Sequence, residues 1–271
     1  MIKLEALNLI ISGNDRDDLL YEWYLNERAV NPDTIRPADF NKIERAPASG
    51  PKVDKYEGEI LKAVMRIAKS RVGAVILGAA MRLPEPLYIL PIGARDAVMM
   101  GGYMSSCLAD EAHVSKTDPD DKLPPVKINP RDPSSCKPLK AGGTEIDPQN
   151  ELDSSLVHEM AHAVRPKTSE LWKKVPTGDP WLDFEEFFAT IVQNMFKSER
   201  GDLVLRGGHD ESILSKELAT SAGFMKDLRL HERIEKLYRA EPLAQKLGRL
   251  KGIKFNPFGL ATGQKYGLEL I

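Results

Sequence analysis

The stretch NELDSSLVHEMAHAVRP, residues 150–166, predicts an amphipathic helix with two histidines on one side. Asn150 is a favourable N-cap, because its side chain can accept a hydrogen bond from the first turn, where acidic residues also crowd. Pro166 cannot continue a helix and restricts the residue before it, so we expect the helix to end at Arg165. One apolar stripe predicts that the helix packs against a core: Leu152, Leu156, Met160, Ala163 and Val164.

His158 and His162 are four positions apart, so their imidazoles lie on the same side of the helix and can share a metal ion. Glu159 lies about 100° further around the helix, where its carboxylate can reach a metal-bound water molecule rather than the metal. Zinc hydrolases use such a carboxylate to accept the proton of the activated water. The H-E-x-x-H pattern therefore predicts one Zn²⁺ per chain, with Glu159 as the general base. The alternative is that two histidines fall four apart by chance.

Two histidines leave a third protein ligand to be found. The metzincin pattern requires glycine three residues and histidine six residues after the second histidine, and the chain has Arg165 and Thr168 there. The other common ligand is a glutamate on a following helix. Residues 178–201, GDPWLDFEEFFATIVQNMFKSERG, predict such a helix, with Asp179 as its N-cap and Gly201 just past its end.

This second helix offers two adjacent carboxylates, Glu185 and Glu186. Burial alone favours Glu185, which shares its face with apolar side chains, where an acid needs a cation as partner. Glu186 has Thr190 four residues on, a hydrogen-bonding side chain able to orient a ligand, and its other neighbours on the wheel are small or polar, as suits a cleft. We expect Glu186 to be the third metal ligand and keep Glu185 as the alternative.

The segments HEMAHAV and EEFFAT resemble the zinc helices of bacterial gluzincin toxins of the lethal factor type. An upstream I-x-x-S-x-x-G pattern (Ile67, Ser70, Gly73), a strand and an I-D-P segment are similar to type III effector zinc peptidases that cut host signalling kinases. The resemblance covers roughly residues 56–200, and only the two zinc helices match specifically. It implies that Glu186, directly before F-F-A, is the zinc ligand.

The same resemblance implies a catalytic tyrosine seven residues before the zinc glutamate, where this chain has Asp179. The group that stabilises the oxyanion must then come from elsewhere. We expect His209, in a glycine-flanked loop after the second helix, to take this role. Arg206, His231 and Tyr238 are further candidates, and the alternative for each is an ordinary surface or packing residue.

The pattern of elements predicts an α+β fold of the zincin type, a small twisted sheet packed on the zinc helix. Two helical stretches are expected between residues 56 and 81, and a helical tail through about residue 248. Strands are expected within residues 86–93, 126–129 and 143–147. We expect the last of these to form the sheet edge to which an extended substrate adds.

The chain of 271 residues, with a net charge of −2, is long enough for one sizeable core and shows no general attraction to nucleic acid. It has no recognisable signal peptide or membrane anchor, and two cysteines cannot form a disulfide framework. We expect residues 1–50 to serve delivery or secretion, and residues 51–271 to form the metallopeptidase domain with its helical tail. The role of the proline-rich residues 117–138 is left open.

Together these patterns predict a zinc-dependent endopeptidase, which we expect to be a monomer. The resemblance to bacterial toxins implies that it is made in the cytoplasm and injected into another cell as an effector or toxin. Its partner would be a protein of the host or of a rival cell, with no membrane and no nucleic acid involved. One alternative is a housekeeping zinc hydrolase inside the producing cell. Another is a binding protein with a structural zinc site, although such sites are usually rich in cysteine, and neither cysteine lies near the motif.

Overall fold

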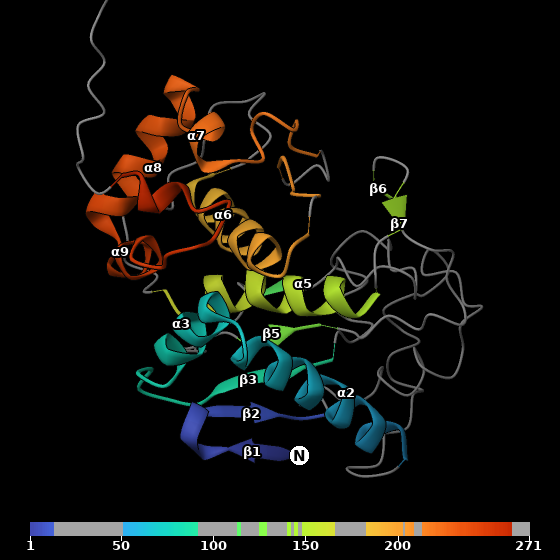
Figure 1. Ribbon diagram of the computed structural model, residues 1–271. Coiled ribbons are helices and arrows are strands. Elements are labelled where there is room, and N and C mark those ends of the chain that lie inside the picture. Colours follow the sequence, from blue (N-terminus) through green and yellow to red (C-terminus); the bar gives the residue numbers. More distant parts are fainter. Residues whose placement is uncertain are drawn as a thin grey trace, which may run out of the picture.

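The computed structural model gives the fold for most of the chain (Figure 1). It describes residues 1–13, 51–91, 113–114, 125–128, 140–141, 144–145, 148–165, 183–202, 204–208 and 213–261. Strands and helices mix within it, as expected for the α+β class. Within these ranges, no helix is both long and apolar enough to cross a membrane.

A five-stranded sheet lies at the base of the molecule in the order β1-β2-β3-β5-β4 (Figure 1). Its strands are β1 (Ile2–Leu4), β2 (Leu9–Ile11), β3 (Leu87–Leu90), β4 (His113–Val114) and β5 (Val126–Lys127). The three inner strands are parallel, and the outer strands β1 and β4 are antiparallel to their neighbours. The strands predicted within residues 86–93 and 126–129 are therefore confirmed.

The strand predicted within residues 143–147 is present, but it is not an edge of this sheet. β7 (Thr144–Glu145) pairs antiparallel with β6 (Lys140–Ala141) in a separate two-stranded sheet. Gly142 and Gly143 separate the two strands, and two glycines between strands are a typical β-hairpin signal. Among the described strands, the edges of the main sheet are β1 and β4.

The boundary predicted near residue 50 does not separate the first residues from the domain. β1 and β2 are joined by a 3₁₀ turn (Glu5–Leu7), and β2 pairs with β3 along its whole length, Ile10 opposite Tyr88. The β2 side chains are buried in the common core. Residues 1–13 thus belong to the main fold rather than to a separate N-terminal segment.

Two helices follow, α2 (Pro51–Ala68) and α3 (Arg71–Ala80). α2 buries Ile60, Val64 and Ile67, as their three- and four-residue spacing predicts. α2 contacts β2. The helix that carries His158 and His162, α5 (Pro148–Ala163), contacts β5, β4 and α2, so α2 and α5 lie side by side over the sheet.

The motif helix α5 (Pro148–Ala163) is buried on all sides from Glu151 to Ala163. It begins three residues earlier than the cap at Asn150 predicted, and proline is favourable in a first helical turn. An amphipathic helix with one exposed face was expected, and this expectation is wrong. α6 (Phe184–Glu199) covers the side of α5 away from the sheet (Figure 1), so even the acidic residues in the first turns of α5 lie inside the protein.

Basic side chains of two neighbouring helices, α2 and α6, compensate those buried acids. Asp153 is fully buried between Arg66 of α2, at 2.7 Å, and Arg200 at the end of α6, at 2.6 Å. Glu151 pairs with Lys197 of α6 at 3.4 Å. A buried carboxylate without a partner would cost several kcal/mol, on the order given for isolated buried charges. The pairs therefore fix how α2, α5 and α6 pack together.

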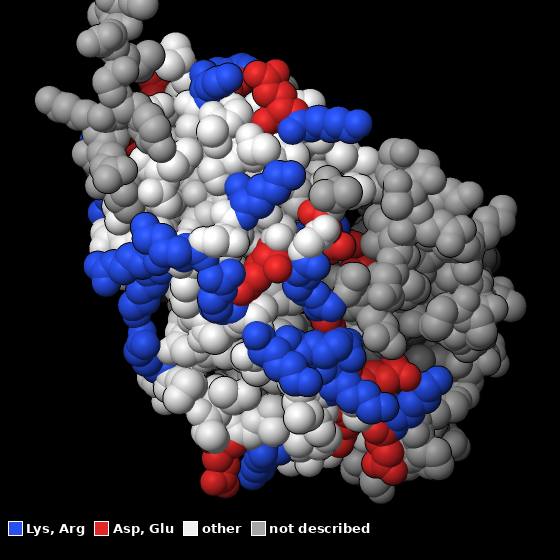
Figure 2. Space-filling model, viewed as in Figure 1, with Lys and Arg blue, Asp and Glu red and all other residues white. Residues whose placement is uncertain are grey.

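Basic side chains are also prominent on the surface. Figure 2 shows lysine and arginine side chains over the face on which α2 and α3 lie, with acidic side chains between them. Some of this positive charge is used within the fold, since Arg71 binds Glu199 at 2.7 Å and Arg66 binds Asp153.

The second predicted helix, α6 (Phe184–Glu199), begins four residues later than the cap at Asp179 predicted. Its N-cap is Asp183, whose side chain accepts a hydrogen bond from the backbone N–H of Glu186 at 2.8 Å. Its end agrees with the prediction, because Gly201 has φ +87°, a left-handed conformation that favours glycine.

The C-terminal tail is helical, as predicted. It contains α7 (Ser221–Phe224), α8 (Leu228–Ala240), α9 (Pro242–Gly248) and a 3₁₀ turn (Pro257–Gly259). Leu230, Ile234 and Leu237 of α8 are buried, and α9 packs against α3. These helices complete the core around the upper end of α6 (Figure 1).

Candidate metal centre

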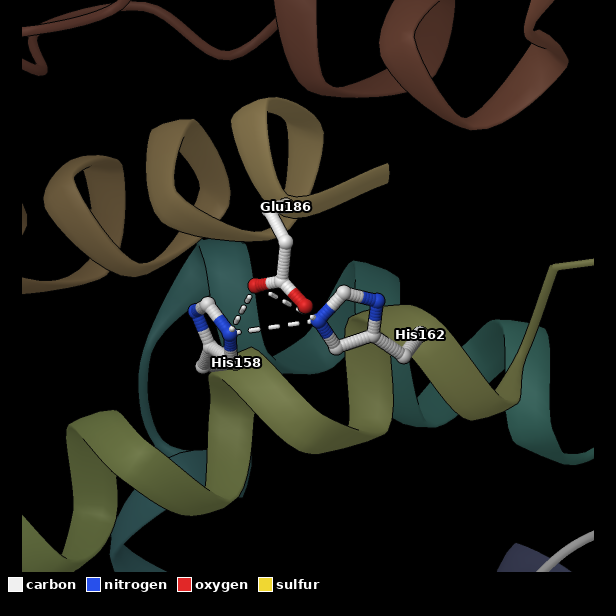
Figure 3. A group of neighbouring side chains, drawn as sticks. All are labelled: His158, His162 and Glu186. Atoms are coloured by element: carbon white, nitrogen blue, oxygen red, sulfur yellow. Dashed lines mark hydrogen bonds and ion pairs between the residues drawn. The ribbon is translucent and has the colours of Figure 1, made fainter. Parts of the chain in front are cut away.

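Two helices bring together the three residues predicted to bind metal. His158 and His162 occupy successive turns of α5, and Glu186 lies in the first turn of α6, which packs against α5. Figure 3 shows the carboxylate of Glu186 pointing down between the two imidazole rings. Because the histidines and Glu186 lie on different helices, the three side chains meet only when α5 and α6 pack together.

The three ligand atoms form a nearly equilateral triangle. Nε2 of His158 lies 3.2 Å from Nε2 of His162, and Oε2 of Glu186 lies 3.4 Å and 3.5 Å from these two nitrogens. Ligand atoms about 2.0–2.1 Å from a tetrahedral Zn²⁺ would lie about 3.3–3.4 Å from one another. The three residues could therefore hold a metal ion without rearrangement, and their ligand atoms form such a group.

Glu159 is buried beside the triangle and does not belong to it. Its Oε1 lies 3.9 Å from Nε2 of His158, further than the ligand atoms lie from each other. The residue following a ligand on a helix points about 100° away, which keeps this carboxylate next to the centre rather than in it. The position suits a group that exchanges protons with a molecule at the metal.

Glu185, the alternative ligand, occupies a different position. Its Oε1 lies 3.1 Å from Nδ1 of His162, on the ring edge opposite the triangle, and its Oε2 lies 2.5 Å from Nη1 of Arg165. Glu185 is fully buried. The cation that an acid on the apolar face requires is thus Arg165, and Glu185 orients a histidine instead of adding a ligand atom to the triangle.

The environment shifts the proton affinities of all three ligand residues. Burial lowers the pKa of His158 to about 4. Burial also opposes protonation of His162, but hydrogen bonds to Glu185 and Glu186 outweigh it and raise the pKa of His162 to about 10. Burial acts against the ionised form of Glu186 as well, yet the two imidazoles hold the pKa of this carboxyl far below its usual range. At neutral pH these shifts favour the protonated form of His162 and the neutral form of His158.

Two buried polar atoms near the site have no hydrogen-bond partner among the residues that the structure describes, Nδ1 of His158 and Oγ1 of Thr190. Thr190 was expected to orient Glu186. Since no described bond joins them, this reason for preferring Glu186 is not supported, although Glu186 does lie in the triangle.

The candidates for oxyanion stabilisation lie in different places. His209 lies outside the described residues. Arg206 is close enough for its charge to contribute to the low pKa of His158, and Asn194 of α6 holds its backbone through two hydrogen bonds of 2.8 Å. His231 pairs with Glu235 on the surface of α8.

Tyr238 also lies on α8, and no described contact joins Tyr238 or His231 to the triangle.

Sequence reasoning missed Arg165 and Glu241 as parts of the site. Arg165 was interpreted only as the end of the helix, while the need of Glu185 for a cation was the signal that pointed to it.

No family model matches the chain, and neither a curated protein nor a solved structure matches it. Its function must be inferred from the site.

Proposed function

We propose that this protein is a zinc-dependent endopeptidase with a zincin-type fold. The observation that carries the proposal is the triangle of two imidazole nitrogens and one carboxylate oxygen, 3.2–3.5 Å apart, with Glu159 beside it. Three protein ligands leave a fourth position of a tetrahedral ion for water or substrate, which distinguishes catalytic from structural zinc sites.

The donor set favours zinc over magnesium and calcium. Magnesium and calcium prefer sites made wholly of oxygen atoms, whereas two imidazoles and one carboxylate suit Zn²⁺. When bound, zinc would activate a water molecule and polarise the carbonyl of the scissile peptide bond. The side chains His158, His162 and Glu186 would hold it.

Glu159 has the proton-transfer role in this proposal. It is buried against His158, away from bulk solvent, so its carboxylate would lie beside a water molecule held at this site. It would accept the proton of the attacking water and then donate it to the leaving amine. Arg206 is the described candidate for stabilising the oxyanion, and His209 is the candidate outside the described residues.

An extended substrate segment would bind along β4. Among the described strands, β4 is the sheet edge that contacts α5, and an edge strand offers unpaired backbone groups to a peptide. The resemblance to effector zinc peptidases suggests a host or rival-cell protein as substrate, with secretion or injection from the producing cell. Residues after Gly13 would serve delivery, and the chain would act as a monomer.

The variant Glu159→Gln tests the proposal, with denatured casein as substrate and mass spectrometry to detect new peptide ends. We expect wild-type protein loaded with zinc to cleave it, and the variant to lose about 10²–10⁴-fold in rate while keeping its metal. Glu217→Gln, at an exposed site, is the matched control and should retain full activity. Cleavage by Glu159→Gln at the wild-type rate would exclude this carboxylate as the base.

A further inference from the structure

A continuous line of buried charged groups leads from the metal site into the C-terminal helices. Nδ1 of His162 lies 3.1 Å from Glu185, and Glu185 lies 2.5 Å from Nη1 of Arg165. Nη2 of the same guanidinium lies 3.0 Å from Oε1 of Glu241. The side chains are 8%, 0%, 1% and 6% exposed from His162 to Glu241. We call Glu185, Arg165 and Glu241 the buried charge network.

The first contact of the network determines which nitrogen of His162 faces the triangle. A carboxylate accepts hydrogen bonds, so Glu185 holds the ring with Nδ1–H directed toward it. Nε2 is then the nitrogen with a lone pair when the ring is neutral, and this atom is the one that faces His158 and Glu186. Carboxylates that hold a metal-binding histidine in this manner typically raise metal affinity.

Arg165 makes the burial of Glu185 possible. Its guanidinium lies 4.4 Å from the centre of the Phe188 ring and divides its fork between two carboxylates. Its Nε is buried without a hydrogen-bond partner among the described residues, which is a cost for placing the fork there. A guanidinium suits this position because its planar shape reaches two acids and stacks on an aromatic ring.

Glu241 fixes the far side of Arg165 from the junction of α8 and α9. It is the last residue bound to α8, through its N–H to Leu237 at 2.8 Å, and its carbonyl accepts the N–H of Gln245 in α9 at 3.1 Å. Its backbone is therefore held by both helices. Any change in the packing of these helices changes the position of its carboxylate.

We propose that the buried charge network makes α8 and α9 part of the metal centre, with Glu185, Arg165 and Glu241 as positioning residues that set metal affinity. This inference rests on the proposed function, since it assigns the network to the same metal. The helices after residue 220 are then required for tight metal binding, although they contribute no ligand.

The zinc dissociation constant, measured by competition with a chromophoric chelator at constant pH, tests the inference. We expect Glu185→Gln to weaken zinc binding about 10–100-fold, as is typical when a partner of a metal-binding histidine is changed. Glu241→Gln should weaken it several-fold, because it acts through Arg165. Arg165→Lys keeps the charge but loses the two-sided fork, and it should also weaken binding.

Glu151→Gln is the matched control, because the Glu151–Lys197 pair is equally buried between α5 and α6 and touches no ligand. It should bind zinc within about twofold of wild type, since its side chain pairs with Lys197 and with no member of the buried charge network. Urea unfolding checks that each variant is folded, and Arg165→Lys and Glu241→Gln carry the test should Glu185→Gln not fold. Wild-type affinity in the network variants would overturn the inference while leaving the metal site intact. A wild-type protein that binds no zinc would overturn the proposed function as well.

Discussion

Glu185 and Glu186 are neighbours in the chain, but they contact different ring nitrogens of the same histidine, His162. Glu186 lies 3.5 Å from Nε2 of His162, and Glu185 lies 3.1 Å from its Nδ1. The imidazole is thus held between two carboxylates, one on each ring nitrogen. This arrangement stabilises its protonated form when no metal is bound, and metal binding must displace that proton.

The proton on His162 predicts how zinc affinity depends on pH. The pKa of His162 is raised to about 10, while that of His158 is lowered to about 4, so zinc binding near pH 7 should release about one proton. Affinity should rise about tenfold per pH unit between pH 7 and 9, because protons compete for Nε2. Calorimetry in buffers of different ionisation enthalpy measures the released proton. An affinity that is constant across this range would contradict the assignment.

For single residues, the sequence predicted that His158, His162 and Glu186 lie together. It did not predict the contacts that separate the role of Glu186 from that of Glu185. The four-residue spacing of His158 and His162 determines their common face on any helix, so that part followed from geometry alone. The choice of Glu186 rested on its small or polar neighbours, on the resemblance and on Thr190, whose hydroxyl forms no described hydrogen bond. The actual difference is Arg165, which reaches Glu185 only because α5 and α6 pack together.

At the scale of elements, the turn between α2 and α3 explains the I-x-x-S-x-x-G pattern. Ser70 is the N-cap of α3, and its hydroxyl accepts the N–H of Gly73 at 2.8 Å while donating to the carbonyl of Ile67 at 3.0 Å. A side chain at Gly73 would collide with that same carbonyl oxygen and approach the Ser70 hydroxyl to 2.7 Å. The pattern is therefore a tight turn between helices, which carries no catalytic group.

Two glycines of α3 give a matched test of this turn. We expect Gly73→Ala to lower the free energy of unfolding by about 1–3 kcal/mol, because the backbone must shift to admit the methyl group. Gly78→Ala, where no atom lies within 4 Å of the added carbon, should raise it by about 0.5–1 kcal/mol through helix propensity. Urea titration measures both. Equal effects would show that the contact at Gly73 does not limit the turn.

Element boundaries were predicted less well than element types. Asp179 followed by proline and Asp183 are both good helix starts four residues apart, and only packing decides that Asp183 caps α6. The strand at residues 143–147 was predicted correctly, but its partner was not, since pairing depends on the hairpin with Lys140–Ala141.

At the scale of the whole molecule, the motif helix lies between the sheet and the remaining helices. α5 contacts β4 and β5 on one side and α6 on the other, and the network reaches from α5 to the α8–α9 junction. The sequence did not predict this central position, because its polar residues resembled an exposed face. The acidic residues Glu151 and Asp153 are nevertheless buried, because each pairs with a basic side chain distant in the sequence.

The opposite pKa shifts predict how stability of the metal-free protein varies with pH. The pKa of His162 is raised to about 10. Its contribution to the free energy of unfolding is therefore complete below its ordinary pKa of 6.5 and is lost as the pH rises toward 10. The contribution of His158, whose pKa is lowered to about 4, is complete above 6.5 and is lost as the pH falls toward 4. These two groups should therefore give a maximum near pH 6.5. Thermal unfolding of the wild type and of His162→Gln, which should lose the alkaline decline, measures this.

Zinc should also stabilise the fold as a whole, because it binds the packed helices and not the unfolded chain. At free zinc about 100-fold above its dissociation constant, the gain is about 2.7 kcal/mol, and a chelator should remove it. Thermal unfolding with and without chelator measures the effect. Glu186→Ala should show no such gain, and an equal gain in that variant would place the bound zinc elsewhere.

The most direct measurement is the zinc content of purified protein, determined by elemental analysis after saturation with zinc and removal of the excess. We predict about one zinc per chain in the wild type and in Glu185→Gln, and none retained by Glu186→Ala, since three ligands of a single site are required. Zinc that is lost from Glu185→Gln but retained by Glu186→Ala would exchange the roles of the two glutamates. A wild-type protein without zinc would contradict the account of the metal centre.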